Sequence, residues 1–506
     1  MKELLLKSTV FRFLERFVLL VISLLLTPFM IKHLGEDGYG LWILILSVLT
    51  WFNVVNLGFP VAVQRNITLA LEENDQGKVN QVFSTSIALF FVLGIFAAGG
   101  LLILAQFPQW LGVPGPMEVT VTYCFYFLTL KIVWGFLMNC LHGFYAAVLR
   151  FDIDANISSL NALLKAVGVF IFLPTLDIFG AVAATLAADA ITNTYKLYWV
   201  KKNYPQLRFS KALISRAQFF NLFHFSKHVV AMGIARTINA KSDPVIVTRI
   251  FDVAAVTMFS IANRLAHHVE AFVGSVSGLF QPVFTRMVAR GTNMERFFHQ
   301  VTSLNIFICV TFFMPLYILS PLFIPLWVGE QFLPAAQLIG FFVFGYLCIA
   351  AGSGIKNVLL AQANHKWLSV ANLIGAIVHI ALSIYLAKDY GLMGVAMGTP
   401  IGFFVSELII KCYLLKHYCQ FRLWPIYIRF VSAVIILYGF GYPIKTWILQ
   451  YSSPSWLSLL IFGAVLFPLV ALMNYFLLLD RGVKDKLGAM LTQFRTSQQE
   501  SKGVVK

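Results

Sequence analysis

Long hydrophobic stretches separated by short polar segments follow one another along almost the whole chain. Each stretch is close to the roughly 20 apolar residues that a helix needs to cross a bilayer. The pattern predicts about fourteen membrane-spanning helices. They are expected at residues 10–33, 40–63, 80–106, 118–148, 155–175, 179–200, 219–244, 252–285, 297–322, 334–361, 367–388, 392–415, 424–446 and 456–479.

The first polar interruption is the segment HLGEDGYGLW, which begins at His33. It lies between two hydrophobic runs and holds two acids and three glycines. At a membrane surface the backbone can bond to water, so glycines can turn the chain at little cost. We therefore expect an outer hairpin that joins the first two spans.

The composition supports a membrane protein. Of the 506 residues, 59% are hydrophobic and 12% charged, and the mean hydropathy is +0.79. A soluble domain is nearer half apolar and a quarter charged. The first span carries Arg12, Glu15 and Arg16 without a small-residue cleavage site, which favours a retained helix over a signal peptide. The predicted fold class is an all-α membrane protein.

Basic residues are distributed unevenly between the loops. The loops after odd-numbered spans carry few basic residues, and QFPQWLGVPGP and LPTLDIFG contain none. The loop after the sixth span holds five (Lys201, Lys202, Arg208, Lys211 and Arg216). The positive-inside rule then places both termini in the cytoplasm. This bias accounts for most of the net charge of +16. No soluble basic domain exists that would indicate nucleic-acid binding.

Motifs for catalysis or metal binding are weak. The six cysteines show no CxxC or metal-ligand spacing, so we expect buried free thiols and no metal site. The pair Asp152 and Asp154 has the DxD spacing of some glycosyltransferases, but no soluble domain accompanies it. No Walker lysine loop is present, so ATP hydrolysis is not expected.

An internal repeat links the two halves of the chain. The segment GAVAATLAADAITNTYKLYWVKKNY begins at Gly180, and GVAMGTPIGFFVSELIIKCYLLKHY begins 214 residues later at Gly394. Parallel repeats of this kind usually form two lobes with the substrate between them. We predict an N-lobe of six helices (1–210), a C-lobe of six helices (211–420) related to it by a pseudo-two-fold axis, two further helices (421–480) and a cytoplasmic tail (481–506).

The hairpin and its neighbours resemble a known family. PFMIKHLGEDGYGLWILILSVL, VNLGFPVAVQRNITLALEENDQGKVNQVFSTSIAL and INAKSDPVIVTRIFDVAAVTMFSIANRL occur in the order and spacing of the polysaccharide (O-antigen-type) flippases of the multidrug/oligosaccharidyl-lipid/polysaccharide exporter superfamily. The hairpin signature of that family is met by Leu34, Gly35, Glu36, Tyr39 and Gly40. The resemblance covers roughly residues 10–480.

The resemblance implies a transporter, not an enzyme. Such proteins flip an oligosaccharide linked to undecaprenyl diphosphate across the bacterial inner membrane by alternating access, for surface polysaccharide biosynthesis. Besides this glycan and the membrane lipids, candidate partners are the polysaccharide polymerase and chain-length proteins. No organic cofactor is expected, and H⁺ or Na⁺ is the candidate coupling ion of an antiporter.

Charged residues inside the spans are the candidate site. A cation at the bilayer centre costs about 3 kcal/mol on insertion scales, so it is rarely incidental. A diphosphate head group would be held by such cations through charge-assisted hydrogen bonds. The candidate substrate-binding residues are Arg12, Arg16, Arg65, Lys131, Lys227, Arg236, Arg264 and Lys356. The alternative for those near span ends is that the side chains reach to the interface.

Intramembrane acids and one histidine are candidates for ion coupling, because such groups can change charge as their exposure changes. They are Asp189, Asp243, His268, Glu270 and Glu407. Static ion pairs are the alternative for this set, for example between Asp243 and Arg236.

Two other functions remain open. A cation-coupled multidrug exporter of the same superfamily should favour acids over bases in its lumen, whereas bases outnumber acids in the middle of these spans. A membrane glycosyltransferase or polymerase would need a large external loop with a catalytic carboxylate or histidine, and every predicted outer loop is short.

Overall fold

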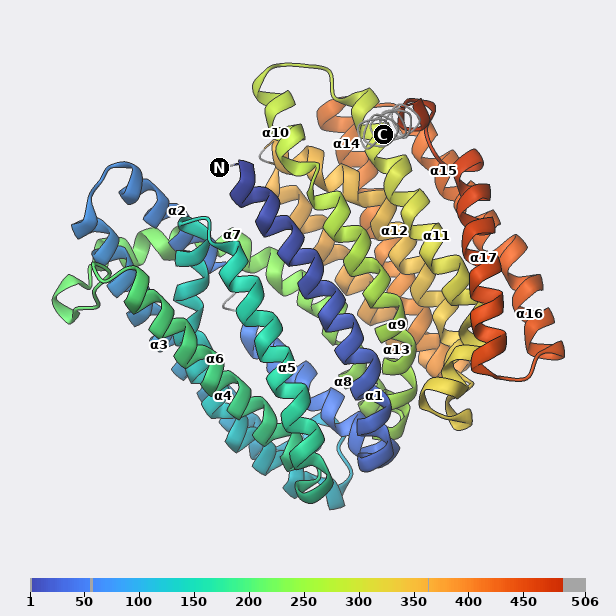
Figure 1. The fold of residues 1–506 in the computed structure, drawn as a ribbon, viewed down its shortest axis with the longest axis horizontal. Helices are drawn as coiled ribbons and strands as arrows, with labels where there is room; N and C mark the ends of the chain where they lie inside the picture. Colours follow the sequence, from blue (N-terminus) through green and yellow to red (C-terminus); the bar gives the residue numbers. More distant parts are fainter. Residues whose placement is uncertain (1, 55–57, 363, 486–506) are drawn as a thin grey trace, which may run out of the picture. The chain divides into compact units, whose positions relative to one another are not determined.

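The computed structural model describes residues 2–54, 58–362 and 364–485. Within these ranges, the side chains of residues 2–13, 151 and 365 and of several positions between 225 and 240 are not described. All regular structure in the described residues is helical (Figure 1). Nine of the described helices are long and apolar enough to cross a membrane. The predicted all-α membrane fold is confirmed.

The chain divides into two compact units, of which the first comprises residues 1–260 with 383–395. Within it, α3 packs on α4 and α5 packs on α6, while α1 packs along α5 and α2 packs on α4. Its helices are α1 (Lys2–Asn53), α2 (Phe59–Glu72), α3 (Gln76–Ala105), α4 (Gly115–Ala147), α5 (Phe151–Leu176), α6 (Ile178–Asn203), α7 (Arg216–Lys241), α8 (Asp243–Ile250) and the start of α9 (Val253–Gly278).

The second unit comprises residues 261–382 with 396–506. Helix α11 is its centre, because α12, α15, α16 and α17 all pack against it. The unit contains the rest of α9, α10 (Gln281–Ala289), α11 (Glu295–Val328), α12 (Ala335–Ala361), most of α13 (His365–Phe403), α14 (Lys411–Cys419), α15 (Trp424–Val434), α16 (Gly441–Tyr451) and α17 (Trp456–Leu477). π-helical segments join α13 to α14 (Phe404–Ile410) and α15 to α16 (Ile435–Phe440).

The first hairpin turns at Gly35, as the sequence predicted. Its φ of 71° and ψ of −177° break α1 into two helical parts. Gly40 follows on the second part, where any Cβ would overlap the Val253 carbonyl at the start of α9. The Thr257 hydroxyl donates to the Glu36 carbonyl at 2.6 Å, and Tyr39 is fully buried. The glycines therefore serve both the turn and a close approach of two helices.

Local backbone geometry supports the internal repeat. Asp177 (φ 53°, ψ −139°) and Gly391 (φ 58°, ψ −138°), which lie 214 residues apart, adopt the same rare conformation at two tight helix–helix turns. After each turn a glycine meets the preceding helix: a Cβ on Gly180 would overlap the Phe172 carbonyl, and one on Gly394 would overlap that of Leu386. The predicted lobe boundaries remain a prediction.

Three predicted spans are interrupted in the structure. The second predicted span (40–63) is divided between the end of α1 and the start of α2. The seventh (219–244) is divided between α7 and α8, and the eighth (252–285) between α9 and α10. Pro60, Pro244 and Pro282 lie in the first turn of α2, α8 and α10. Proline is tolerated there because the N–H groups of a first turn have no partner in their own helix. Hydropathy alone does not detect these interruptions.

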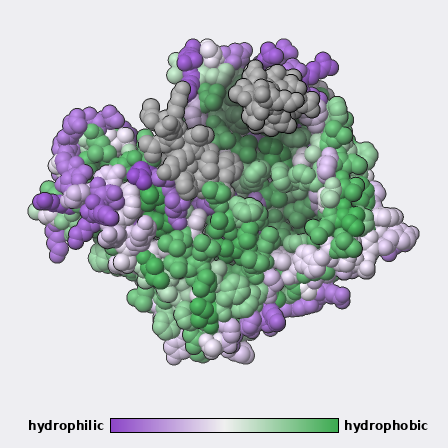
Figure 2. All heavy atoms as spheres, in the orientation of Figure 1, coloured by the Kyte–Doolittle hydropathy of each residue, from purple (hydrophilic) through white to green (hydrophobic). Residues whose placement is uncertain are grey.

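The surface suits a lipid environment. Figure 2 shows hydrophobic residues over much of the visible face and polar residues toward the helix ends. Large side chains such as Phe96 (75% exposed) and Leu457 (70%) face outward in the described structure, which would be unfavourable in water.

All six cysteines are unpaired and five are buried, as predicted.

Candidate functional site

A row of polar side chains, here called the polar seam, follows the packing of α4, α5 and α6 in the first unit. Its members on each helix are separated by three, four, seven or eleven residues, which places them on one helical face. The polar seam consists of Lys131 and His142 on α4, Asp154 and Asn161 on α5, and Asp189, Thr192 and Lys196 on α6.

One end of the polar seam centres on Asp189. Lys131 forms an ion pair with Asp189 Oδ2. The amide of Asn161 donates to Asp189 Oδ1 and to Thr192 Oγ1, both at 2.9 Å. The side chains of Lys131 and Asp189 are 28% and 20% exposed, so this pair is only partly enclosed by protein.

The other end of the polar seam centres on His142. Its Nδ1 lies 2.7 Å from Asp154 Oδ1, and its Nε2 lies 3.2 Å from Lys196 Nζ. The Tyr145 hydroxyl donates to the Lys196 carbonyl at 3.2 Å. An imidazole thus stands between a carboxylate and an ammonium, each contributed by a different helix.

The connection between α4 and α5 carries a second ion pair. Arg150 donates from Nε and Nη2 to the two carboxylate oxygens of Asp152, at 2.9 and 3.2 Å. The hydrogen bonds that Arg150 donates to Asp152 raise the pKa of Arg150, and the guanidinium lies 5.1 Å from the centre of the Trp199 ring. Asp152 and Asp154 therefore contact different basic partners, and this arrangement does not resemble a shared metal site.

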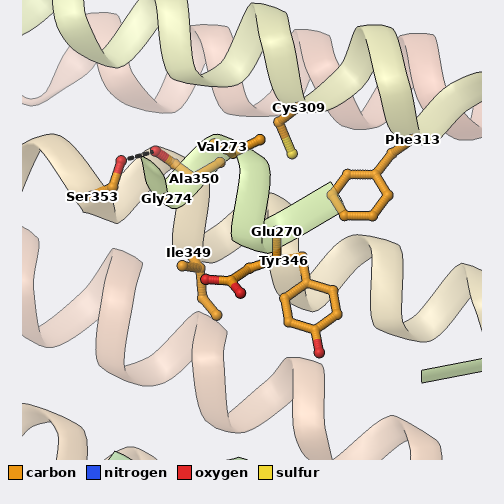
Figure 3. Close-up of a pocket in the computed structure, with 9 residues that line it drawn as sticks. All are labelled: Glu270, Val273, Gly274, Cys309, Phe313, Tyr346, Ile349, Ala350 and Ser353. Atoms are coloured by element: carbon orange, nitrogen blue, oxygen red, sulfur yellow. Dashed lines mark hydrogen bonds between the residues drawn. The ribbon is translucent and has the colours of Figure 1, made fainter. Parts of the chain in front are cut away.

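In the second unit, Glu270 lines a small cavity of about 20 Å³ between α9, α11 and α12 (Figure 3). The cavity has room for about one water molecule. Cys309, Phe313 and Tyr346 line it, and at its far end the Ser353 hydroxyl donates to the Ala350 carbonyl at 2.7 Å. Glu270 Oε2 also lies 3.4 Å from His267 Nδ1.

Next to the cavity, α9, α11 and α12 share a buried cluster of amides and hydroxyls. Asn305 Nδ2 donates to the hydroxyls of Ser277 (3.2 Å) and Ser353 (2.7 Å). Asn357 donates to the Ser277 carbonyl at 2.9 Å. These bonds satisfy polar groups that would be costly to leave unpaired in an apolar bundle.

A buried ion pair in the second unit joins Glu407 and Lys411, whose side chains are 9% and 4% exposed and whose charged atoms lie 2.5 Å apart. Glu407 belongs to the π-helical segment that precedes α14. Gly352 of α12 makes room for it, because a Cβ there would overlap the Glu407 carboxylate. Such π-helical turns often occur at functional sites.

The remaining predicted site residues are spread over both units. Arg16, Arg65 and Lys356 are exposed, Arg264 and His268 are partly exposed, and Asp243 is buried at the first residue of α8. The side chains of Arg12, Lys227 and Arg236 lie outside the described residues, so the expected pairing of Asp243 with Arg236 stays a prediction. Of the predicted residues, the structure brings Lys131 and Asp189 together.

Sequence reasoning overlooked His142, Asn161, Lys196 and Lys411, and it considered Asp154 only as part of a DxD pair. The spacing of polar residues by three, four or seven along adjacent spans was the available signal. It would have grouped Asn161 with Asp154 and Lys196 with Asp189, although the pairing between helices required the structure.

Comparison with known proteins places the chain among membrane proteins of polysaccharide synthesis. It is 22% identical over 399 residues to a putative O-antigen transporter of Shigella flexneri, covering 76% of this chain and 91% of that protein. It is 22% identical over 411 residues to the uncharacterized membrane protein EpsK of Bacillus subtilis, covering 77% and 78%.

Two solved structures share the fold. The lipid II flippase MurJ in an inward closed conformation matches with a TM-score of 0.74 and 16% identity, over 92% of this chain and 98% of MurJ. An inward-facing multidrug resistance MATE family transporter of the MOP superfamily matches with a TM-score of 0.72 and 13% identity, over 84% and 98%. The resemblance seen in the sequence is confirmed. The polysaccharide biosynthesis protein model matches residues 5–288, more than half of the sequence, and the chain therefore belongs to that family.

Proposed function

We propose that the chain is a flippase that moves an oligosaccharide linked to undecaprenyl diphosphate across the bacterial inner membrane by alternating access, with both termini in the cytoplasm. Membership of the polysaccharide biosynthesis protein family supports this proposal. So do the description of its Shigella flexneri relative as a putative O-antigen transporter and the fold shared with the lipid II flippase MurJ.

The observation that carries the proposal is the charge retained inside helices of membrane length. Lys131 and Asp189 in the first unit are only partly enclosed, although a charge at the centre of a bilayer costs about 3 kcal/mol on insertion scales. An anionic, hydrated diphosphate needs such a polar surface to leave the aqueous phase, and an ammonium group can bind it through charge-assisted hydrogen bonds.

Transport against a gradient needs a coupling ion, for which H⁺ and Na⁺ are the candidates. Glu270 supports this part of the proposal because its carboxylate borders a cavity of about 20 Å³. Such a site can hold a proton or one small cation, and an intramembrane acid is a functional candidate by default.

Deletion of the gene tests the function directly. We expect lipid-linked glycan to accumulate in the inner leaflet and surface polysaccharide to be lost, and expression of the intact chain to restore both. Unchanged lipid-linked glycan would contradict the proposal. If drug sensitivity rose instead, the multidrug exporter would be favoured, and accumulation of unextended glycosyl lipids would favour a polymerase or glycosyltransferase.

A matched pair of variants tests the role of mid-span cations. Arg264→Ala removes a partly exposed guanidinium from α9, whereas Arg290→Ala removes an exposed one after α10. We expect Arg264→Ala to abolish surface polysaccharide at a normal protein level in the membrane and Arg290→Ala to leave it unchanged. Wild-type polysaccharide in the Arg264→Ala strain would remove this residue from the site.

A further inference from the structure

The connection between α6 and α7 concentrates positive charge on the first unit. Residues 201–216, here called the basic loop, comprise the last turn of α6, the connecting segment and the first residue of α7. They include no acid, and all of their basic side chains are exposed. None of these cations forms an ion pair with another residue that the structure describes. They are Lys201, Lys202, Arg208, Lys211 and Arg216.

The backbone of the basic loop is held against the start of α3 (Figure 1). Asn80, Ser84 and Thr85 of α3 accept hydrogen bonds from three N–H groups of the loop, at 3.0, 3.1 and 3.1 Å. The Ser84 hydroxyl also lies 3.4 Å from a loop carbonyl, to which it donates. Because the backbone is fixed, the basic side chains are presented together, and less conformational entropy is lost when they bind a partner.

Apolar side chains accompany the charges. Phe209 and Ile214 are 49% and 41% exposed, although they lie outside the predicted spans 179–200 and 219–244. Lys202 and Arg216 each lie over an aromatic ring of their own helix, 5.9 and 5.7 Å from its centre. Aromatic residues favour the interface between membrane and water. Exposed apolar groups together with basic residues form the combination that binds a charged lipid surface.

The acids beside the basic loop have partners of their own. An open groove of about 460 Å³ lies between the loop and the start of α3, and Asp75 and Lys78 line it. The Asp75 carboxylate accepts a hydrogen bond from the Lys78 backbone at 2.8 Å and so caps α3. The Lys78 ammonium lies 2.6 Å from the Glu73 carboxylate. These contacts leave the five cations of the loop as the charge that an external anion would meet.

We propose that the basic loop is a binding surface for the head groups of anionic phospholipids, such as phosphatidylglycerol. Their phosphates accept charge-assisted hydrogen bonds from Arg and Lys, while Phe209 and Ile214 contact the acyl boundary. Four to eight basic residues directly beyond a membrane span are typical of such recognition. Phosphatidylcholine has the same phosphate but carries a compensating ammonium, so the surface selects the anionic lipid. This inference goes beyond the proposed function and is independent of the glycan that is transported.

Native mass spectrometry of the full chain in detergent, titrated with phosphatidylglycerol or phosphatidylcholine of identical acyl chains, tests the inference. A basic residue near an anionic surface contributes about fivefold in affinity. We therefore expect the triple variant to bind its first phosphatidylglycerol at least about tenfold more weakly and to bind phosphatidylcholine as the wild type does. This variant combines Arg208→Gln, Lys211→Gln and Arg216→Gln.

A matched control removes the same charge elsewhere. It replaces three exposed arginines of the second unit, in and after α10, and should leave phosphatidylglycerol affinity within about twofold of the wild type. These substitutions are Arg286→Gln, Arg290→Gln and Arg296→Gln. Wild-type affinity in the basic-loop variant, or an equal loss in the control, would overturn the inference. Loss of binding to undecaprenyl phosphate without loss of binding to phosphatidylglycerol would instead assign the loop to substrate recognition.

A second variant tests the role of the fixed backbone. Asn80→Ala removes one hydrogen-bond acceptor of the loop without changing any charge. We expect phosphatidylglycerol to bind about threefold more weakly because the basic side chains are no longer preorganised. Gln81→Ala truncates the neighbouring amide of α3 and should have no such effect. Equal affinities in the two variants would refute the positioning by α3.

Discussion

The buried pair of Glu407 and Lys411 allows a quantitative prediction. Glu407→Gln keeps the shape of the side chain but removes its charge, and Lys411→Met does the same for the ammonium. In the described structure each charged group is at least nine-tenths buried, and the two lie 2.5 Å apart. Each single variant leaves its partner as an uncompensated charge, while the double variant leaves none.

Breaking a buried pair from one side costs about 3–5 kcal/mol, whereas replacing both partners by uncharged side chains of similar volume is close to neutral. We therefore expect each single variant to lower the free energy of unfolding by about 3–5 kcal/mol. Scaling for units of 150–250 residues gives a lowering of Tm by roughly 10 °C. The double variant should recover most of this loss.

Thermal unfolding of the purified protein in detergent measures both quantities. Lys416→Met, the same substitution at an exposed position of α14, is the control and should change Tm little. A double variant as unstable as the singles would show that packing in the π-helical turn, not charge pairing, sets the cost. Single variants with the Tm of the wild type would refute the premise that these charges are buried.

Three further variants test helix contacts by the same thermal measurement. Gly40→Ala should destabilise by at least about 1–3 kcal/mol because its methyl would overlap the Val253 carbonyl, whereas Gly99→Ala, with open space around it, should not; equal Tm values would contradict the close approach. Thr257→Val should cost about 1 kcal/mol by removing the 2.6 Å hydrogen bond to the Glu36 carbonyl; a neutral result would mean that water replaces the hydroxyl. Asp177→Gly should stabilise and Gly391→Ala destabilise, each by about 1 kcal/mol, because only glycine adopts these angles without strain; a destabilised Asp177→Gly would mean that the carboxylate supports the turn.

Hydropathy predicted the fold well because the bilayer imposes one length and one polarity on every span. The repeat was visible for a related reason. Gly180 and Gly394 each have to admit a helix backbone, so the same residue type was required at both turns. The breaks near Pro60, Pro244 and Pro282 were missed, because an interrupted helix and a continuous one have the same mean hydropathy.

The candidate site was harder to predict from the sequence. Charge inside a span identified Lys131 and Asp189 individually, but their pairing depends on how α4 and α6 are rotated against each other. His142 was overlooked because it carries no formal charge at neutral pH and lies near a span end. Its two polar contacts are made by side chains of α5 and α6, and the sequence pattern does not show which helices lie next to α4.

Two ion pairs in membrane-length helices of the described structure differ in how far they are enclosed. Glu407 and Lys411 are enclosed and lie on successive turns of one helix, so neither can exchange its partner without unpacking the bundle. Lys131 and Asp189 come from different helices, retain 28% and 20% exposure, and share hydrogen-bond donors with the rest of the polar seam. Partial exposure therefore makes Lys131 and Asp189 stronger candidates for the proposed binding site than the enclosed pair.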